Sequence, residues 1–317
     1  MLRRLSSSLP FIIDSSLAPE TLEKYNNAWK LWIDWTAAVP EVSAFPCDPF
    51  SVAIYLNFLL HTRGKIGPIR SAVNAISWAH RSAGYASPTD EDFVTLTLKG
   101  CERILGQPTR KSVAMTSEII HDLYNKFHSS NLHDQRFLAI LLICYTGFLR
   151  IDELLTIQLK HIDLHTDKML LFLPQCKNDQ LRQGNTVYIA ALDSKYCPVK
   201  FVRNYLRLCD FNTTTDPEAH LLPRLVKRKS GLYAHRSRGI SYTTAREIFS
   251  IHVQQLYPTT RYTLHSLRSG GASDAANNGV EPRLISKHGR WKTTKSRDGY
   301  IADSTENRLS VSRALGL

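Results

Sequence analysis

The stretch FLAILLICYTGFLRIDE, which runs from Phe137 to Glu153, determines how the C-terminal two-thirds of this chain folds. Residues 137–148 are predominantly apolar, which predicts a core helix with Cys144 among its buried side chains. Arg150 and Glu153 follow directly. Arg150 is therefore either a charge at a helix end or a side chain that the core holds in a functional site.

Five residues downstream of Arg150 have an order and spacing that suit phosphodiester chemistry: Lys177, His265, Arg268, Trp291 and Tyr300. A tyrosine hydroxyl has a pKa of about 10, so it needs a base for its proton and cations for the charge that develops on the phosphate. Arginine can hold two phosphate oxygens, histidine titrates near neutral pH, and lysine can protonate a departing 5′ oxygen. Such a set can cleave DNA without a metal or another cofactor.

Each of these residues taken alone also has an ordinary explanation. A histidine and an arginine three positions apart are common on surfaces, and a tryptophan or tyrosine late in a chain is often part of a core. Lys177 has Lys168 and Lys195 nearby and could simply be solvated. The nearby acidic residues form no carboxylate cluster, which argues against a two-metal nuclease. The order and intervals of the whole set favour a functional site.

These motifs resemble those of the tyrosine recombinases of the phage integrase family. The segment 146–154, with Arg150 and Glu153, is similar to the first arginine box of the family, and His265-Ser-Leu-Arg268 with the following residues 269–271 is similar to the second. The segment 289–301 is similar to the third, with Trp291 where many relatives have a second histidine. Lys177 lies where the family has the lysine of a β-hairpin.

The resemblance implies a role for each residue. Tyr300 would attack the scissile phosphate, form a 3′-phosphotyrosine bond and leave a free 5′ hydroxyl. Arg150 and Arg268 would clamp the non-bridging oxygens. The remaining roles are proton acceptor or phosphate holder for His265, general acid for Lys177, N–H donor to the phosphate for Trp291 and support of the site for Glu153. Because the bond energy is kept in the covalent intermediate, religation would need no ATP.

The charge of the chain indicates a polyanionic partner, which we expect to be double-stranded DNA. The net charge is +12 and the isoelectric point is near 9.5. Residues 1–110 carry a net charge of +1 and the remainder +11, so most of the attraction for phosphate lies with the expected catalytic residues. The six cysteines lack zinc-like spacing, which predicts reduced thiols in an intracellular protein. No apolar stretch reaches the ~18 residues of a membrane span.

The hydrophobic pattern predicts a mostly α protein with two domains. Residues 1–18 are expected to be a flexible leader, and 19–105 a core-binding domain of four to five amphipathic helices. Residues 106–114 are polar, contain glycine and proline, and are predicted to be a linker. Residues 115–317 would form the catalytic domain, with a small β-hairpin from 168–173 and 186–189 around Lys177 and a short helix in the C-terminal tail.

Three groups of side chains are candidates for DNA contact. The first is on or near the predicted helix 68–83, the second is in the linker, and the third is a basic run predicted to be a loop. The residues are Lys65, Arg70, Asn74 and Arg81; Arg110 and Lys111; and Lys227, Arg228, Lys229 and Arg236. Each group could also be an ordinary solvated surface, and the basic run could instead be a nuclear import signal.

We therefore predict a site-specific DNA recombinase. The resemblance implies four protomers on two DNA sites, a Holliday junction intermediate, and a C-terminal tail that docks on a neighbouring protomer; the alternative for the tail is packing on its own domain. Two other functions stay open, a type IB topoisomerase-like nicking-closing enzyme and a silent, domesticated DNA-binding protein. In a eukaryote the expected location is the nucleus and the expected source is a mobile element; otherwise the expected location is the cytoplasm or nucleoid. Whether the outcome is DNA integration, excision or inversion stays open.

Overall fold

The computed structural model describes residues 2–106, 112–129, 131–174, 184–229 and 231–316. The chain divides into two compact units, residues 1–110 and 111–317. This division falls within the segment 106–114, of which residues 107–111, including Arg110 and Lys111, lie outside the described residues. Among the described helices, none is long and apolar enough to cross a membrane.

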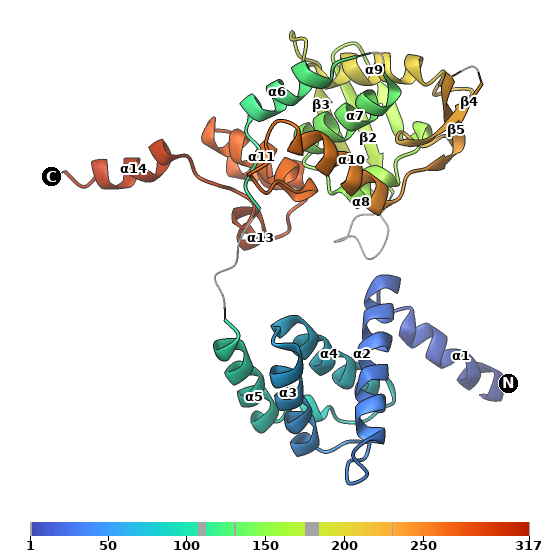
Figure 1. Cartoon of the computed structure of the whole chain (residues 1–317), viewed down its shortest axis with the longest axis vertical. Helices are drawn as coiled ribbons and strands as arrows, with labels where there is room; N and C mark the ends of the chain where they lie inside the picture. The colour runs from blue at the N-terminus through green and yellow to red at the C-terminus, as the bar shows by residue number, and fades with distance from the viewer. Residues whose placement is uncertain (1, 107–111, 130, 175–183, 230, 317) are drawn as a thin grey trace. The chain divides into compact units, whose positions relative to one another are not determined.

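The first unit is entirely helical over its described residues (Figure 1). Its elements are α1 (Leu2–Asp14), α2 (Pro19–Ala37), α3 (Pro49–Arg63), α4 (Ile66–Ser82), the 3-10 turn η1 (Pro88–Asp90) and α5 (Asp92–Ile104). Local sequence sets the ends of α3. The Asp48 carboxylate accepts the backbone N–H of Ser51 at 3.0 Å, and Gly64 ends the helix with a φ of 56°, a left-handed conformation that glycine adopts without strain.

The core of the first unit comes from the apolar faces of α2, α3, α4 and α5. Trp32 of α2 is fully buried and packs against Tyr55 of α3, with ring centroids 5.1 Å apart. Ile69 and Ile76 of α4 are also fully buried. The helices predicted within 19–105 are therefore present, and their apolar spacing correctly identifies the buried faces.

The segment expected to be a flexible leader forms a helix instead. Helix α1 covers Leu2–Asp14 and contains Pro10. Its described side chains are mostly exposed, including Leu9, Phe11 and Ile12. The serines and the proline in this stretch suggested irregular structure, but leucine and isoleucine at helical spacing favour a helix when the proline N–H is the only donor lost.

The second unit contains the remaining elements (Figure 1). The helices are α6 (Ser117–Phe127), α7 (Leu132–Thr146), α8 (Ile151–Leu155), α9 (Pro198–Leu208), α10 (Tyr242–Gln254), α11 (Leu264–Asn277), α12 (Pro282–Gly289), α13 (Thr294–Asp298) and α14 (Thr305–Arg313), with the 3-10 turn η2 (Leu159–His161). The strands are β1 (Ile162–Leu164), β2 (Lys168–Leu173), β3 (Asn185–Ala190), β4 (Pro223–Arg228) and β5 (Gly231–Gly239).

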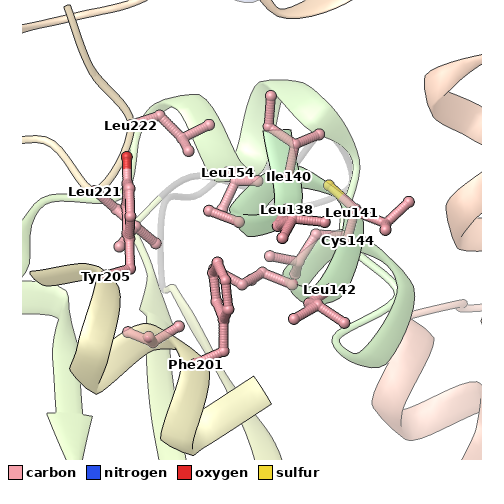
Figure 2. Close-up of a cluster of buried hydrophobic side chains, with 14 of the residues drawn as sticks. Leu138, Ile140, Leu141, Leu142, Cys144, Leu154, Phe201, Tyr205, Leu221 and Leu222 are labelled. Carbon is pink, nitrogen blue, oxygen red and sulfur yellow. The ribbon is translucent and has the colours of Figure 1, made fainter. Parts of the chain in front are cut away.

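Helix α7 is the centre of the second unit. All its residues from Gln135 to Cys144 are buried, and α6, α8, α9, α10 and α11 pack against it. Figure 2 shows side chains of α7 beside Leu154 of α8 and Phe201 of α9, with Tyr205 of α9 next to Leu221. The predicted burial of this apolar segment, with Cys144 in the core, is confirmed. Because Arg150 and Glu153 follow α7 after a short turn, this core fixes their backbone.

A small antiparallel sheet has the strand order β1-β2-β3. Leu171 of β2 pairs with Val187 of β3, and Met169 pairs with Ile189. All four side chains are buried, which explains why alternation of apolar residues predicted this hairpin correctly. Lys177, in the connection between β2 and β3, lies outside the described residues.

The basic run forms a hairpin where the sequence predicted a loop. Strands β4 and β5 pair antiparallel, with Leu225 opposite Ala234 and Val226 opposite Tyr233. The charges obscured a short β pattern in which Ala234 is buried and Leu225 is partly buried.

Helix α11 passes very close to two neighbouring segments. A Cβ atom on Gly270 would lie 1.9 Å from the carbonyl oxygen of Met115, and one on Gly271 would lie 2.2 Å from that of Tyr145. Glycine at these two positions therefore allows α11 to approach its neighbours closely. The predicted class, mostly α with small β elements, is confirmed.

Candidate active site

Arg150 and Glu153 form a compact unit at the start of α8. The backbone N–H of Arg150 donates to Glu153 Oε2 at 2.9 Å, and Arg150 Nη1 donates to Glu153 Oε1 at 2.9 Å. The Arg150 side chain is 13% exposed and that of Glu153 3%. The carboxylate therefore aligns the arginine while leaving part of its guanidinium accessible.

Arg268 reaches the same carboxylate from α11. Its side chain is fully buried, and Arg268 Nη1 lies 3.9 Å from Glu153 Oε2. Its Nη2 donates to the carbonyl of Gly289 at 2.6 Å, and its Nη1 donates to the carbonyl of Phe148. The carboxyl of Glu153 is thus shared between an arginine that follows α7 and one that lies on α11.

Trp291 and Tyr300 cover the Arg268 guanidinium. The Arg268 Cζ atom lies 4.6 Å from the Trp291 ring centroid and 5.0 Å from that of Tyr300, both within the range of a cation–π contact. The two rings are 5.3 Å apart. Gly289 makes room for this arrangement, because a Cβ atom there would lie 1.9 Å from the Trp291 ring.

The charges of this cluster perturb each other. Burial raises the pKa of Glu153, but Arg290, the hydrogen bond from the Arg150 backbone and the charges of Arg268 and Arg150 outweigh it, so the pKa is below its ordinary value. Burial, together with Arg150 and Arg290, lowers the pKa of Arg268 to about 10. Both groups stay ionised at neutral pH.

The residues with matched spacing thus converge in space, and a comparison with protein families explains why. Residues 114–307 match the family model described as "Phage integrase family". The chain belongs to this family. It is a tyrosine recombinase, an enzyme of DNA strand breakage and rejoining.

Two relatives are similar to this chain over most of their length. The integrase/recombinase xerD homolog of Selenomonas ruminantium is 25% identical over 303 residues, which cover 94% of this chain and 86% of its relative. The recombinase cre of Escherichia phage P1 is 25% identical over 288 residues, which cover 86% of this chain and 80% of that protein. The similarity therefore extends across both compact units.

Solved structures share the fold at low sequence identity. A XerH site-specific recombinase bound to its palindromic difH substrate matches with a TM-score of 0.59 and 12% identity, over 91% of this chain and 79% of that one. A lambda integrase dimer bound to a COC′ core site matches with a TM-score of 0.57 and 15% identity, over 96% of both chains.

Two residues near the recombinase site carried no predicted role. Arg290 Nη2 donates to Glu153 Oε2 at 2.8 Å, and its side chain is 6% exposed. His288 Nε2 donates to the carbonyl of Thr146 at 2.8 Å, and burial lowers the pKa of this imidazole. Arg290 lies between Gly289 and Trp291, inside a motif that the sequence identified, so its position was the available signal.

Two predicted catalytic residues remain, His265 and Lys177. His265 is exposed in the first turn of α11, where the helix N-terminus adds positive potential. The helix begins at Leu264, where Ser266 Oγ accepts the backbone N–H of Thr263 at 3.0 Å. Lys177 lies outside the described residues, so its placement stays a prediction.

The predicted DNA-contact residues of the first unit are exposed along α4. Lys65 precedes the helix, while Arg70, Asn74 and Arg81 lie on it. Arg70 Nη2 lies 2.7 Å from Glu102 Oε1, and Arg81 Nη2 lies 2.7 Å from Asp90 Oδ2. Such exposed ion pairs are weak, so they leave both arginines available to a phosphate.

The basic residues of the second unit lie on the β4–β5 hairpin. Lys227 and Lys229 are exposed, and Arg228 ends β4. Arg236 of β5 bonds Asp216 and lies 3.0 Å from Asp210 Oδ2. Two carboxylates thus surround Arg236, whereas the lysines extend into solvent.

Proposed function

We propose that this tyrosine recombinase is site-specific and that it cleaves DNA through a covalent bond between Tyr300 and a 3′ phosphate. The convergence of Arg150, Arg268, Trp291 and Tyr300 around the Glu153 carboxylate carries this proposal. No other group of described residues combines a tyrosine with several buried cations in this way.

Buried donors without a partner indicate what the site would bind. At this site, three donors of the described residues are buried and have no hydrogen-bond partner: Arg268 Nε, Arg290 Nε and Trp291 Nε1. An unsatisfied buried donor costs about 1–3 kcal/mol, so such a group needs an explanation, and a bound anion is one. A phosphate oxygen would supply an acceptor for Arg268 Nε and Trp291 Nε1. The Tyr300 ring covers Arg268. Movement of Tyr300 toward the phosphate would therefore expose the Arg268 guanidinium to that phosphate.

Each step of cleavage then has a residue to support it. His265 accepts the Tyr300 proton or holds the phosphate, and the Tyr300 oxygen forms a bond to phosphorus while the bond to the 5′ oxygen breaks. Arg150 and Arg268 stabilise the negative charge on the non-bridging oxygens. Lys177 protonates the departing 5′ oxygen. The reverse attack by a 5′ hydroxyl of another strand completes the exchange.

The DNA grip would use both units. The α4 side chains and the basic hairpin provide exposed cations, and phosphate contacts of this kind give affinity that falls with salt. The linker residues Arg110 and Lys111 would add contacts as the chain passes over the duplex. Which bases the protein reads stays open, because base contacts depend on side chains that reach groove edges.

We further propose that the recombinase assembles as a tetramer through its C-terminal helix. A related lambda integrase tetramer has been solved on a Holliday junction, with a TM-score of 0.55. Helix α14 is exposed along its whole length, including Leu309 and Val311. Its start is attached to the end of α11, where the Asn277 side chain accepts the backbone N–H of Ser304 at 3.1 Å.

The second unit has an apolar cavity that would accept this helix from a neighbouring protomer. The cavity has a volume of about 620 Å³ and lies among β3, α11 and α12. Phe148, Val187, Leu284 and Ile285 contribute apolar surface to it. A neighbour's Leu309 and Val311 would bury their side chains there, which favours association.

The assembly is tested by substituting the two sides separately. Leu309→Asp on the helix and Leu284→Asp in the cavity should each prevent two-site complexes while single-site binding persists, as measured by native gel electrophoresis. Arg308→Ala, on the same helix, should assemble normally. Normal assembly of both aspartate variants would rule out this interface.

The cleavage proposal is tested with nicked suicide duplexes in EDTA. The wild-type protein should form an SDS-resistant complex with DNA, because strand loss at the nick traps the covalent intermediate. Tyr300→Phe should bind DNA with similar affinity but form no complex, whereas Tyr242→Phe, at an exposed tyrosine of α10, should behave as wild type. Tight binding without any adduct would favour the silent DNA-binding alternative.

A further inference from the structure

Arg290 has a backbone conformation that disfavours its own residue type. It ends α12 with φ 58° and ψ 37°, in the left-handed region. Glycine is the usual residue at such a helix end, and other residues cost roughly 1–2 kcal/mol there. The side chain of Arg290 must therefore make contacts that offset this cost.

The contacts of Arg290 use every hydrogen of its two terminal nitrogens. Nη1 donates to the carbonyls of His288 at 2.8 Å and Gly147 at 3.3 Å. Nη2 donates to the carbonyl of Phe148 at 3.0 Å and to Glu153 Oε2 at 2.8 Å. Arg290 consequently has no terminal N–H left for a phosphate, and only its buried Nε has no partner among the described residues. Its two terminal nitrogens act through the groups that they hold.

Those groups form the turn that presents Arg150. Phe148 has a φ of 46°, also in the left-handed region. Its carbonyl accepts hydrogen bonds from both Arg268 and Arg290. Arg150 follows two residues later and bonds to Glu153, which Arg290 holds from the other side. One guanidinium thus fixes both the turn and the carboxylate on which Arg150 depends.

The charges of the cluster point to a second contribution. Three guanidinium groups surround one carboxylate, which leaves an excess of two positive charges. A phosphodiester carries one negative charge, but attack by a tyrosinate transfers a second charge to the phosphoryl group. Without Arg290 the excess within this cluster would be one charge, which equals the charge of the ground-state phosphodiester. Interactions that favour the transition state over the ground state are the ones that accelerate a reaction.

We propose that Arg290 is a positioning residue of the recombination site, which holds Glu153 and the turn before Arg150 and raises the positive charge to match the cleavage transition state. This inference rests on the proposed function. It predicts that Arg290 matters for the rate of cleavage at saturating DNA more than for DNA affinity, because its side chain is buried and its terminal nitrogens donate to protein acceptors.

The test combines a change in the protein with a change in the charge of the substrate. Arg290→Gly removes the guanidinium and suits the left-handed backbone, so folding should be retained. The substrates are a suicide duplex with a normal scissile phosphodiester and one with a methylphosphonate, in which a neutral methyl replaces a charged oxygen. On the phosphodiester, cleavage should fall roughly 10- to 100-fold, as for residues that orient directly acting groups. On the neutral substrate the loss should be clearly smaller.

Further variants separate charge from structure. Arg290→Lys keeps the charge and should recover part of the rate on the phosphodiester, and it decides the question if the glycine variant does not fold. Arg283→Ala, at an exposed arginine of the same helix, should change neither rate. An equal loss of cleavage rate on both substrates would mean that Arg290 only stabilises the structure. It would overturn this inference but not the proposed function. A wild-type protein without a Tyr300-dependent adduct would overturn the proposed function and the inference together.

Discussion

Arg81 in the first unit and Arg290 in the second form ion pairs of almost the same length in very different surroundings. Arg81 Nη2 lies 2.7 Å from Asp90 Oδ2, and both side chains are more than half exposed, at 61% and 58%. Arg290 Nη2 lies 2.8 Å from Glu153 Oε2, with exposures of 6% and 3%. Distance therefore does not distinguish the two pairs, but access to water does.

The difference in solvation gives the two pairs different uses. An exposed pair contributes about 0–1 kcal/mol and exchanges partners readily, so Arg81 can turn to a DNA phosphate at little cost. Loss of one partner from a buried pair costs about 3–5 kcal/mol, because the remaining charge is left without compensation. The arginines around Glu153 are accordingly held in place, as the proposed catalytic role requires, whereas the exposed arginines of α4 can exchange partners, as the proposed DNA contact requires.

The largest effect is expected for Arg268→Ala in the buried cluster. Cleavage should fall by roughly 10²- to 10³-fold or more, as when a preorganised donor to a developing oxyanion is lost. Thermal unfolding should also occur at a lower temperature, since Arg268 links Gly289, Phe148 and Glu153. The cleavage rate is measured on the suicide duplex at a temperature below the unfolding transition. Arg283→Ala is the control. Wild-type cleavage by Arg268→Ala would contradict its role.

A smaller effect is expected for Glu153→Gln, a loss of folding stability that depends on pH. The pKa of Glu153 is lowered in the folded protein, so its ionisation stabilises the fold above the pKa of the unfolded chain, about 4.3. This contribution is lost as the pH falls through the folded value. Glutamine keeps a carbonyl oxygen that can accept from the arginines, so the loss should be smaller than for a fully broken buried pair. We expect the variant to be less stable at pH 7 by about 1.5–3 kcal/mol, the range for a hydrogen bond to a charged group.

Urea unfolding of both proteins from pH 7 down to acid measures this dependence. The difference between wild type and Glu153→Gln should shrink as the pH decreases. A constant difference at every pH would show that the charge of Glu153 does not stabilise the fold.

On the exposed side of the comparison, neutralising the basic hairpin should weaken DNA binding without affecting stability. Replacing Lys227, Arg228 and Lys229 by glutamine should reduce affinity and flatten the dependence of the logarithm of affinity on the logarithm of salt concentration. Each lost phosphate contact reduces this slope by about 0.9. Binding titrations at several salt concentrations test this, and an unchanged slope would return the hairpin to an ordinary solvated surface.

The smallest effect is expected for Arg81→Gln. The free energy of unfolding should change by less than about 1 kcal/mol, because the pair with Asp90 is exposed. Affinity for DNA should decrease slightly if α4 faces the duplex. Chemical denaturation measures the change in stability, and a binding titration measures the change in DNA affinity. A stability loss as large as that of Glu153→Gln would contradict the distinction between exposed and buried pairs.

The sequence predicted the core of each unit well because burial leaves a periodic pattern. The apolar run before Arg150 and the faces of α2, α3 and α4 are examples. It failed for α1, where Pro10 and several serines suggested irregular structure, and for β4 and β5, where charged residues hid short apolar alternation. Both segments are largely exposed, so their sequences lack the strong apolar periodicity of buried elements.

The candidate site was predicted as a set of residues but not as an arrangement. Spacing identified Arg150, Arg268, Trp291 and Tyr300, and the structure brings them together. Spacing could not show that Arg268 is fully buried beneath two rings. Nor could it identify Arg290, because its importance depends on a left-handed backbone and on carbonyls from a distant turn. The catalytic roles themselves stay predictions.

The most direct test of the account is to identify both ends of the covalent bond in the trapped complex. The SDS-resistant adduct would be digested with protease and nuclease, and the modified peptide and the attached nucleotide would be sequenced by mass spectrometry. The account predicts a peptide that contains Tyr300 joined to a 3′ phosphate, with a free 5′ hydroxyl on the released strand. Attachment to another residue, or through a 5′ phosphate, would contradict it.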